Sequence, residues 1–271
     1  MDDQRDLERM LGNLRQFQSE SDASKESEKS PSNAGTSFDA DEFLAGLDAM
    51  FASHTAKDKA DEYLQQAMAD AENAQDYAGL LTVLNETMGF YRSQGRHQEN
   101  QWIIQRAIEL ALRMGLEGTE AWTTTLINAA TSQRAAGNLD QAEDLFEQAL
   151  DAARRTYGPD DRRLAALHNN RSMLFSQTHR RRQAIDELHE SLRILEHSSV
   201  DAQSDVDIAS TCTNLALAML DGEDQPTDAE LEEAQSLARR TLDIYQHAGS
   251  DSSAHYASAL AGAAHVSFAS E

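Results

Sequence analysis

Proline is scarce in this chain: Pro31, Pro159 and Pro226 are the three prolines among 271 residues. Proline interrupts helices because it lacks a backbone N–H and clashes with the preceding turn. Residues that favour helices are frequent instead, chiefly alanine, leucine, glutamate, glutamine and arginine. This composition favours long helices and disfavours a β-sandwich or barrel, in which turns rich in proline and glycine are common.

Cysteine and long apolar runs are also lacking. Cys212 is the one cysteine, so no intramolecular disulfide can form, as is usual in a reducing compartment. It lies in an apolar helical stretch, which favours a buried thiol over a nucleophile. No apolar run reaches the ~20 residues that a membrane-spanning helix needs, and the start Met1-Asp2-Asp3 does not resemble a secretory signal. We expect a cytoplasmic protein.

Basic residues are few, because 23 Lys and Arg stand against 47 Asp and Glu, which gives a net charge of −24. Binding to nucleic acid requires a basic surface that neutralises phosphates. An acidic protein is repelled by nucleic acid and by anionic membranes, so we expect neither as a partner. The acidic surface either keeps the chain soluble or attracts a basic partner.

Motifs of catalysis and metal binding are missing from the sequence. There is no H-E-x-x-H motif, cysteine pair, G-x-S-x-G, P-loop or G-x-G-x-x-G. We therefore predict no enzyme activity, cofactor or metal. We expect His168, His179 and His265 to have structural roles. We expect Trp102 and Trp122 to pack in the core or between repeats.

Two N-terminal segments precede the main body of the chain. Residues 19–37 are polar and include Pro31 and Gly35, so they are predicted to form a flexible linker. Residues 1–18 are predicted to form an amphipathic helix, because apolar residues recur there at helical spacing. These are Leu7, Met10, Leu11, Leu14 and Phe17. The tethered helix either docks in the groove of the protein itself and competes with a partner, or forms a loosely ordered tail.

From Phe38 onward, helical patterns alternate with short polar breaks. Asp39 is the expected N-cap of the first helix, with Glu42 as its partner. Similar breaks begin at Gly95, Gly137 and His179, which are 42 residues apart. The positions that follow the breaks stay in register, as at Ile104, Phe146 and Leu188. A fixed period of this size is typical of stacked helical repeats.

The segment from Asn128 to Leu150 resembles a tetratricopeptide repeat. Ala130 matches the small residue of the first helix of such a repeat, and Gly137 matches the turn residue. The second-helix signature is matched by Ala142, Phe146 and Ala149. Repeats of the family usually span 34 residues, and the excess here is about two helical turns. The unit resembles the longer subtype of kinesin light chains and many bacterial regulatory proteins, which implies a bacterial source. The resemblance implies an all-α fold, a right-handed α-solenoid of antiparallel helical hairpins.

The solenoid is expected to occupy residues 38–271. Its hairpins are expected at about 41–75, 80–115, 122–157, 164–198 and 208–247, followed by a final helix at 254–269. Small residues allow two helices to approach closely, and we expect them at three crossings: Ala130 with Ala142, Ser172 with Ala184, and Ala216 with Ala234. Residues 221–227 form an insertion in the fourth repeat, which is either tolerated or functional. The final helix lacks a partner and either caps the array or offers an edge for self-association.

Polar residues on the first helices of the hairpins are candidates for peptide binding. In the resembling family, an Asn near the middle of this helix commonly bonds the backbone of an extended peptide. Asn128, Asn170 and Asn214 match that position, and the first full repeat has Asn85 beside it. The further candidates nearby are Arg92, Thr131, Arg134, Asn169 and Gln177. The alternative is that the asparagines bond neighbouring helices.

Two other features bear on the partner. Family members that clamp a carboxyl terminus use Lys beside the Asn, but this chain has no Lys after Lys59, so we do not expect such a clamp. Arginines concentrate between residues 154 and 182, where they form either a patch that attracts anions or an ordinary exposed surface. We predict a scaffold or adaptor that binds a peptide segment of another protein. A peptide-responsive regulatory sensor, a self-assembling structural protein and an enzyme are the alternatives.

Overall fold

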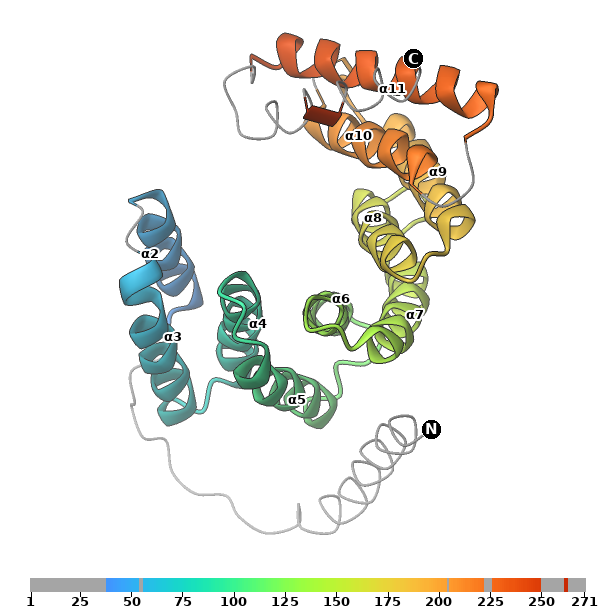
Figure 1. The fold of residues 1–271 in the computed structure, drawn as a ribbon. Helices are drawn as coiled ribbons and strands as arrows, with labels where there is room; N and C mark the ends of the chain where they lie inside the picture. Colours follow the sequence, from blue (N-terminus) through green and yellow to red (C-terminus); the bar gives the residue numbers. More distant parts are fainter. Residues whose placement is uncertain (1–37, 54–55, 204, 222–225, 250–260, 263–271) are drawn as a thin grey trace. The chain divides into compact units, whose positions relative to one another are not determined.

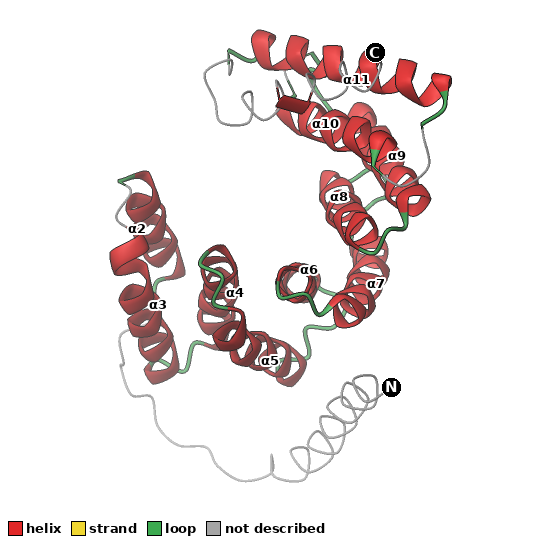
Figure 2. Ribbon diagram, in the orientation of Figure 1, coloured by secondary structure: helices red, strands yellow, loops and turns green. Residues whose placement is uncertain are grey.

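The computed structural model describes residues 38–53, 56–203, 205–221, 226–249 and 261–262. Within these ranges the regular elements are helices, and Figure 2 shows them joined by loops. The expected all-α class is confirmed. The predicted segments 1–18 and 19–37, most of the final helix 254–269 and residues 222–225 of the insertion lie outside the described residues.

The chain divides into two compact units, residues 1–145 and 146–271 (Figure 1). The helices of unit 1 are α2 (Ala40–Ala52), α3 (Ala56–Asn73), α4 (Tyr77–Ser93), α5 (His97–Arg113) and α6 (Glu120–Ala135). Helix α7 (Leu139–Thr156) spans the boundary. The helices of unit 2 are α8 (Arg162–Gln177), α9 (Arg181–Ser198), α10 (Val206–Leu220) and α11 (Asp228–His247).

Helices that are neighbours in sequence pack against each other inside each unit. In unit 1, α2 packs on α3, α3 on α4, α4 on α5 and α5 on α6; α4 also contacts α2 and α6. In unit 2, α8 packs on α9, α9 on α10 and α10 on α11. Helices of even number are therefore the first helices of hairpins, and those of unit 1 lie beside one another.

The turns after α4, α6 and α8 share one backbone geometry. Gly95, Gly137 and His179 have positive φ angles of 68°, 82° and 57°. In each turn this residue donates its N–H to the carbonyl three residues earlier, and the next N–H reaches the carbonyl five residues before it, at 2.8–3.1 Å. This is the Schellman motif, in which a left-handed residue ends a helix. The recurring breaks in the sequence are therefore helix C-caps.

Small buried residues fill the interior of both units. The residues expected at helix crossings are all buried: Ala130, Ala142, Ser172, Ala184, Ala216 and Ala234. Large apolar side chains without exposed surface, such as Leu64, Leu84 and Phe146, form the rest of the core. Burial of each such side chain contributes about 1.5–3 kcal/mol.

Three expectations about single side chains can be compared with the structure. Cys212 is buried, and desolvation raises the pKa of its thiol to about 11, so it stays protonated. Asp39 caps α2 by accepting a hydrogen bond from the Glu42 N–H at 2.9 Å. The expectation that both tryptophans pack in the core or between repeats is correct for Trp122 but wrong for Trp102, whose exposed fraction is 56%.

Candidate functional site: polar faces of the first helices

An amide ladder joins the first helices α4 and α6 in unit 1. Asn85 of α4 donates through Nδ2 to the Thr125 hydroxyl at 3.1 Å, and Asn128 donates to Asn85 Oδ1 at 3.0 Å. Asn85 Nδ2 also donates to the Leu81 carbonyl at 3.0 Å. Both N–H groups and the oxygen of Asn85 are therefore used inside the protein.

The same ladder recurs between α8 and α10 in unit 2. Asn169 donates to the Thr211 hydroxyl at 3.3 Å, and Asn214 donates to Asn169 Oδ1 at 2.9 Å. The threonine precedes the second asparagine by three residues in both ladders, which places the two side chains on one helix face. The two ladders fix the register of neighbouring first helices in the two units.

The asparagines that end the ladders retain open hydrogen-bonding groups. Asn128 and Asn214 each donate one N–H, and within the described residues nothing bonds the other N–H or the Oδ1 atom of either. Asn170 is half-buried and has no hydrogen bond to a described residue. Thr131 bonds the Ile127 carbonyl at 2.7 Å. The open amides can therefore receive a partner that carries both a donor and an acceptor.

Two arginines flank the ladder of unit 1, and both lie in the last turn of their helices. Arg92 of α4 donates through Nη1 to the Ser132 hydroxyl of α6 at 3.4 Å. Arg134 of α6 lies two residues after Ser132, and its Nε is buried with no hydrogen-bond partner among the described residues. Desolvation lowers the pKa of both guanidinium groups, and the charge of Arg92 lowers that of Arg134 further. We call Asn85, Arg92, Asn128, Ser132 and Arg134 the α4–α6 face.

One carboxylate also lies on α4, near the ladder. Glu86 is half-buried, and desolvation, with a smaller effect from the Asp48 charge, raises the pKa of its carboxyl group. It forms no ion pair with Arg92 or Arg134. The first helices of unit 1 therefore carry charged groups of both signs that do not neutralise one another.

The candidate residues thus fall into two groups. Unit 1 brings together Asn85, Arg92, Asn128, Thr131 and Arg134 on α4 and α6. In unit 2 the candidates are Asn169, Asn170, Gln177 and Asn214, and the ladder joins the first and last of these. Gln177 is exposed at the C-terminal end of α8.

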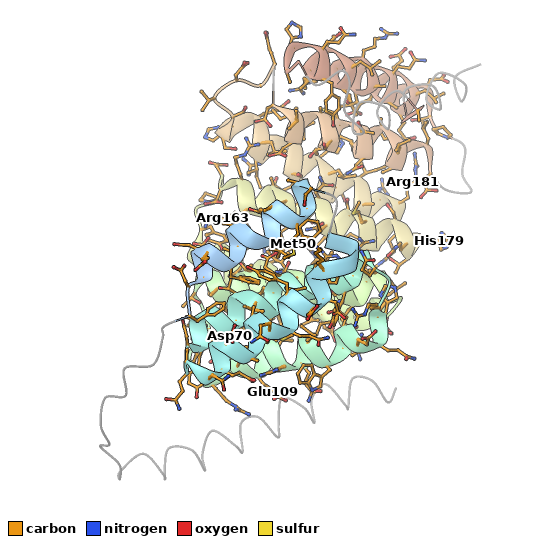
Figure 3. The ribbon with its side chains drawn as sticks, turned by 90° about the vertical axis from the view of Figure 1, so that its left-hand side faces the viewer. Met50, Asp70, Glu109, Arg163, His179 and Arg181 are labelled. Atoms are coloured by element: carbon orange, nitrogen blue, oxygen red, sulfur yellow. The ribbon has the colours of Figure 1, made fainter. Side chains whose placement is uncertain are left out.

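Most arginines between residues 154 and 182 are neutralised within unit 2. Arg162 of α8 pairs with Asp205 at 2.7 Å and Asp207 at 2.5 Å. Further pairs are Arg155 with Asp151, Arg163 with Asp161, Arg171 with Glu187, and Arg181 with Glu230; Figure 3 labels Arg163 and Arg181. These internal pairs leave little net positive charge, so they argue against an anion-attracting patch at this segment.

His168 belongs to a buried network between α8 and α9. Its Nδ1 atom lies 2.6 Å from Glu187, which also pairs with Arg171 at 2.9 Å. The three side chains are at most 14% exposed. His168 thus has the structural role expected from the sequence, as part of a satisfied polar network.

Two clefts lie on unit 1, away from the α4–α6 face. One, of about 560 Å³, is bounded by α3, α4 and α5 and includes the exposed rings of Tyr77 and Trp102. Glu109, which Figure 3 labels, also lines this cleft. The Arg106 guanidinium lies 4.9 Å from the Trp102 ring centroid, within cation–π range. The second, of about 570 Å³, lies between α2 and α3 and includes Phe38.

The described helices show neither a metal site nor a membrane span. No group of three or more His, Cys, Asp or Glu side chains is placed to hold a metal ion in the described ranges. No helix among those same residues is both long enough and apolar enough to cross a membrane.

Sequence reasoning missed the two threonines that complete the ladders. A partial signal was available, because a T-x-x-N pattern occurs at Thr125–Asn128 and at Thr211–Asn214, although it also occurs at Thr82–Asn85. It also missed Ser132, the hydroxyl that accepts from Arg92. A serine on a helix offers no distinguishing pattern, so only the packing of α4 on α6 reveals it.

Comparison with known proteins agrees with this geometry. The model of a family described as tetratricopeptide repeat matches residues 120–197. A search of curated proteins found no match. Among solved structures, BtubC (BKLC) from P. vanneervenii superposes with a TM-score of 0.64 at 18% identity, over 76% of this chain and 80% of that one. Two structures of a putative kinesin light chain with nearly identical TPR-like repeats, from Podosopora anserina, give TM-scores of 0.59 and 0.58 at 14% identity, over 70% of this chain and 86% of theirs.

These likenesses define the class of protein. Residues 120–197 are tetratricopeptide repeats, and the chain has the fold of tetratricopeptide-like solenoids, kinesin light chain repeats among them. The resemblance stated from the sequence is confirmed, whereas a bacterial source stays a prediction. Repeats of this family generally mediate protein–protein interactions and generally have no enzymatic activity.

Proposed function

We propose that this protein is a non-enzymatic scaffold or adaptor that holds an extended peptide segment of a partner protein on the first helices of its hairpins. The general role of tetratricopeptide repeats supports a protein partner. The net charge of −24 argues against nucleic acid and anionic membranes as partners. The lone buried thiol suits a cytoplasmic location.

One observation carries the proposal: the amide of Asn128 is positioned by the ladder but not saturated by it. Its bond to Asn85 fixes the side chain, while one N–H and the Oδ1 atom of this half-buried residue have no hydrogen bond to a described residue. A peptide group also offers one donor and one acceptor, so it can complete both bonds of the amide. Because the rotamer is already fixed, little conformational entropy is lost on binding.

The ladder in unit 2 supports the same function at a second position. Asn214 holds the place of Asn128 there, with its bond to Asn169 made and its Oδ1 atom open. Asn85 and Asn169 act as supports for the binding amides. A peptide-responsive regulator and a self-assembling structural protein stay alternatives, and no described residue favours either.

Selection from a phage-displayed library of random 12-residue peptides tests this function. We expect the wild-type protein to enrich binding peptides and the Asn128→Ala variant to bind a synthetic copy of the best one about three- to tenfold more weakly, as loss of one or two hydrogen bonds implies. Asn73→Ala, which removes an exposed amide from α3, is the matched control and should bind like the wild type. Circular dichroism confirms that both variants are folded. Failure to enrich any peptide, or equal affinity for Asn128→Ala, would contradict the function.

A further inference from the structure

Most half-buried arginines in this protein contact a carboxylate. Within the described residues, this holds for Arg96, Arg106, Arg162, Arg171, Arg181 and Arg240. Arg180 instead donates to the Thr178 hydroxyl at 2.9 Å and lies over the Phe175 ring. Arg92 and Arg134 are also half-buried and form no ion pair with a described carboxylate, although acids outnumber bases two to one in the sequence.

These two arginines are also close to each other, so repulsion between their charges adds to the free-energy cost of burying them without a carboxylate partner. Arg92 reaches from α4 to the Ser132 hydroxyl on α6, two residues before Arg134. The Nε group of Arg134 is buried, and no described residue forms a hydrogen bond with it. Buried charges in folded proteins are usually paired, because desolvation of an unpaired charge is unfavourable. Two like charges side by side add repulsion to that cost.

The helix ends offset only part of this cost. Both arginines lie in the last turn of their helices, where the negative end of the helix dipole stabilises a cation. That interaction does not supply an acceptor for Arg134 Nε. A planar oxyanion does, because a guanidinium presents parallel N–H groups that match the two oxygens of a carboxylate.

We propose that Arg92 and Arg134 together bind an oxyanion on a side chain of the partner peptide, so that the peptide carries an acidic residue where it crosses the ends of α4 and α6. This inference rests on the proposed function. It adds the chemical class of the partner: an extended segment whose backbone meets Asn128 and whose acidic side chain enters between the two guanidinium groups. The acid relieves the repulsion between the arginines and completes the bonds of Arg134.

This site differs from a clamp for a carboxyl terminus. The chain has no Lys after Lys59 to serve such a clamp, and two arginines on adjacent helices suit an oxyanion in the middle of a segment as well as at its end. A carboxylate of Asp or Glu and the phosphate of a phosphoserine share the required chemistry. The experiment must therefore separate a side-chain carboxylate, a phosphate and a terminal carboxylate.

The test uses the same library, in which each peptide is fused to the coat protein through its C-terminus and has no free terminal carboxylate. Selections are made on the wild type, on the double variant Arg92→Gln/Arg134→Gln and on the control Arg113→Gln/Arg239→Gln. The control removes two exposed arginines, so it changes the net charge equally. We expect Asp or Glu to be enriched at one peptide position by the wild type and by the control, and the preference to disappear with the double variant.

Affinity measurements on the best synthetic peptide complete the test. Replacing its acidic residue with the amide should weaken binding to the wild type about tenfold and leave binding to the double variant unchanged. Phosphoserine at this position should restore binding, whereas a free C-terminal carboxylate on the amide version should not. Circular dichroism establishes that each variant is folded.

The outcomes distinguish this inference from the function on which it depends. If peptides bind but show no acidic preference, or if the double variant keeps that preference, the anion site is wrong and the scaffold function stands. If a free terminal carboxylate restores binding, the arginines hold a chain end and the side-chain proposal is wrong. If no protein selects any peptide, the function and the anion site are both overturned.

Discussion

At the scale of single residues, Arg162 shows how an arginine becomes a structural clamp when carboxylates are present. Its guanidinium bonds both oxygens of Asp205, at 2.7 and 2.9 Å, and also Asp207. Asp205 is the N-cap of α10 and accepts further bonds from the Asp207 N–H and the Ser199 hydroxyl. One arginine of α8 thereby fixes the start of α10. The arginines of the α4–α6 face form no ion pair with a described carboxylate, and under our proposal this contrast separates a binding arginine from a structural one.

The clamp predicts a dependence of stability on pH. Bonding to Arg162, opposed by burial, lowers the pKa of Asp205 from 3.8 to about 2. A depressed carboxyl pKa stabilises the fold above the unfolded value of 3.8, and this stabilisation is lost as the pH falls through about 2. Arg162→Gln should therefore lower the free energy of unfolding at pH 7 by about 1 kcal/mol, because solvent screens the partly exposed arginine. The loss should shrink between pH 4 and pH 2.

Urea denaturation across this pH range measures the effect. Arg155→Gln is the control, because Arg155 and Asp151 form an exposed pair of the kind that contributes little to stability. The free energy of unfolding of Arg162→Gln is compared with that of the wild type at pH 7 and at pH 2. If the two differences are equal, the clamp does not act through ionisation of Asp205.

At the scale of the elements, the repeat depends on helix C-caps that place one residue in the left-handed region. Glycine occupies this place at positions 95 and 137, and a Cβ there would meet no atom within 4 Å. The constraint at these positions is therefore the φ angle and not the available space. His179 holds the equivalent place with φ 57° and carries the strain that glycine avoids (Figure 3).

His179→Gly should accordingly stabilise the protein, by roughly 0.5–1 kcal/mol. The same change at His189, an exposed residue inside α9, should destabilise it by about 1 kcal/mol, since glycine is unfavourable in a helix interior. The midpoints of urea denaturation of the two variants and of the wild type give both differences in stability. A loss of stability in both variants would mean that the side chain of His179 contributes more than its backbone strain costs.

The amide ladders make a second prediction at this scale. Asn85 and Asn128 bond each other across α4 and α6, so their contributions to stability should be coupled. A double-mutant cycle with Asn85→Ala and Asn128→Ala should show a coupling free energy of about 0.5–1.5 kcal/mol, the usual net value of one hydrogen bond. Asn85→Ala should cost more than Asn128→Ala, because it also removes the bonds that Asn85 donates to the Leu81 carbonyl and the Thr125 hydroxyl.

The equivalent cycle with Asn128 and Asn73, on α3, serves as the control and should show no coupling, because no hydrogen bond joins that pair in the described residues. If the coupling of Asn85 with Asn128 were also near zero, the ladder would not fix the register of α4 and α6. The asparagines would then be available to a partner without any cost to the fold.

The elements also show what the sequence can and cannot predict. The 42-residue step predicted the recurring turns, because a left-handed cap needs glycine or a tolerant residue at one fixed place. It could not decide whether an asparagine on a first helix meets a peptide or a neighbouring helix, because both require the same helix face. Asn85 uses all its bonds internally, whereas Asn128 keeps some open, and this difference depends on where Thr125 falls.

Charge partners are equally hard to predict, because they depend on contacts between distant residues. The arginines between 154 and 182 form a dense cluster in the sequence, yet carboxylates such as Asp205 and Glu230 neutralise members of it from other helices. Arg92 and Arg134 are isolated in the sequence, and only packing reveals that no carboxylate of the described residues pairs with them. Exposure of Trp102 has the same origin, since apolar character alone does not identify the face that a neighbouring helix covers.

At the scale of the whole chain, the excess of acidic residues should make stability depend on ionic strength. With 47 acids and 23 bases, neutralising every base in an ion pair would still leave 24 negative charges. Their mutual repulsion opposes the compact state. At about 0.01 M salt the screening length is roughly 30 Å, so charges repel across much of a folded unit, and at about 0.1 M it falls to roughly 10 Å.

Added salt should therefore raise the melting temperature. Between about 0.01 and 0.15 M NaCl we expect an increase of roughly 2–4 °C, which corresponds to about 1 kcal/mol for a chain of this size. Salt also weakens exposed ion pairs such as Arg155 with Asp151, but those contribute so little that repulsion decides the sign. Circular dichroism melts in NaCl and in KCl should agree, because screening depends on ionic strength and not on the cation. A melting temperature that falls with salt would mean that the ion pairs of the described helices stabilise the fold by more than the excess negative charge destabilises it.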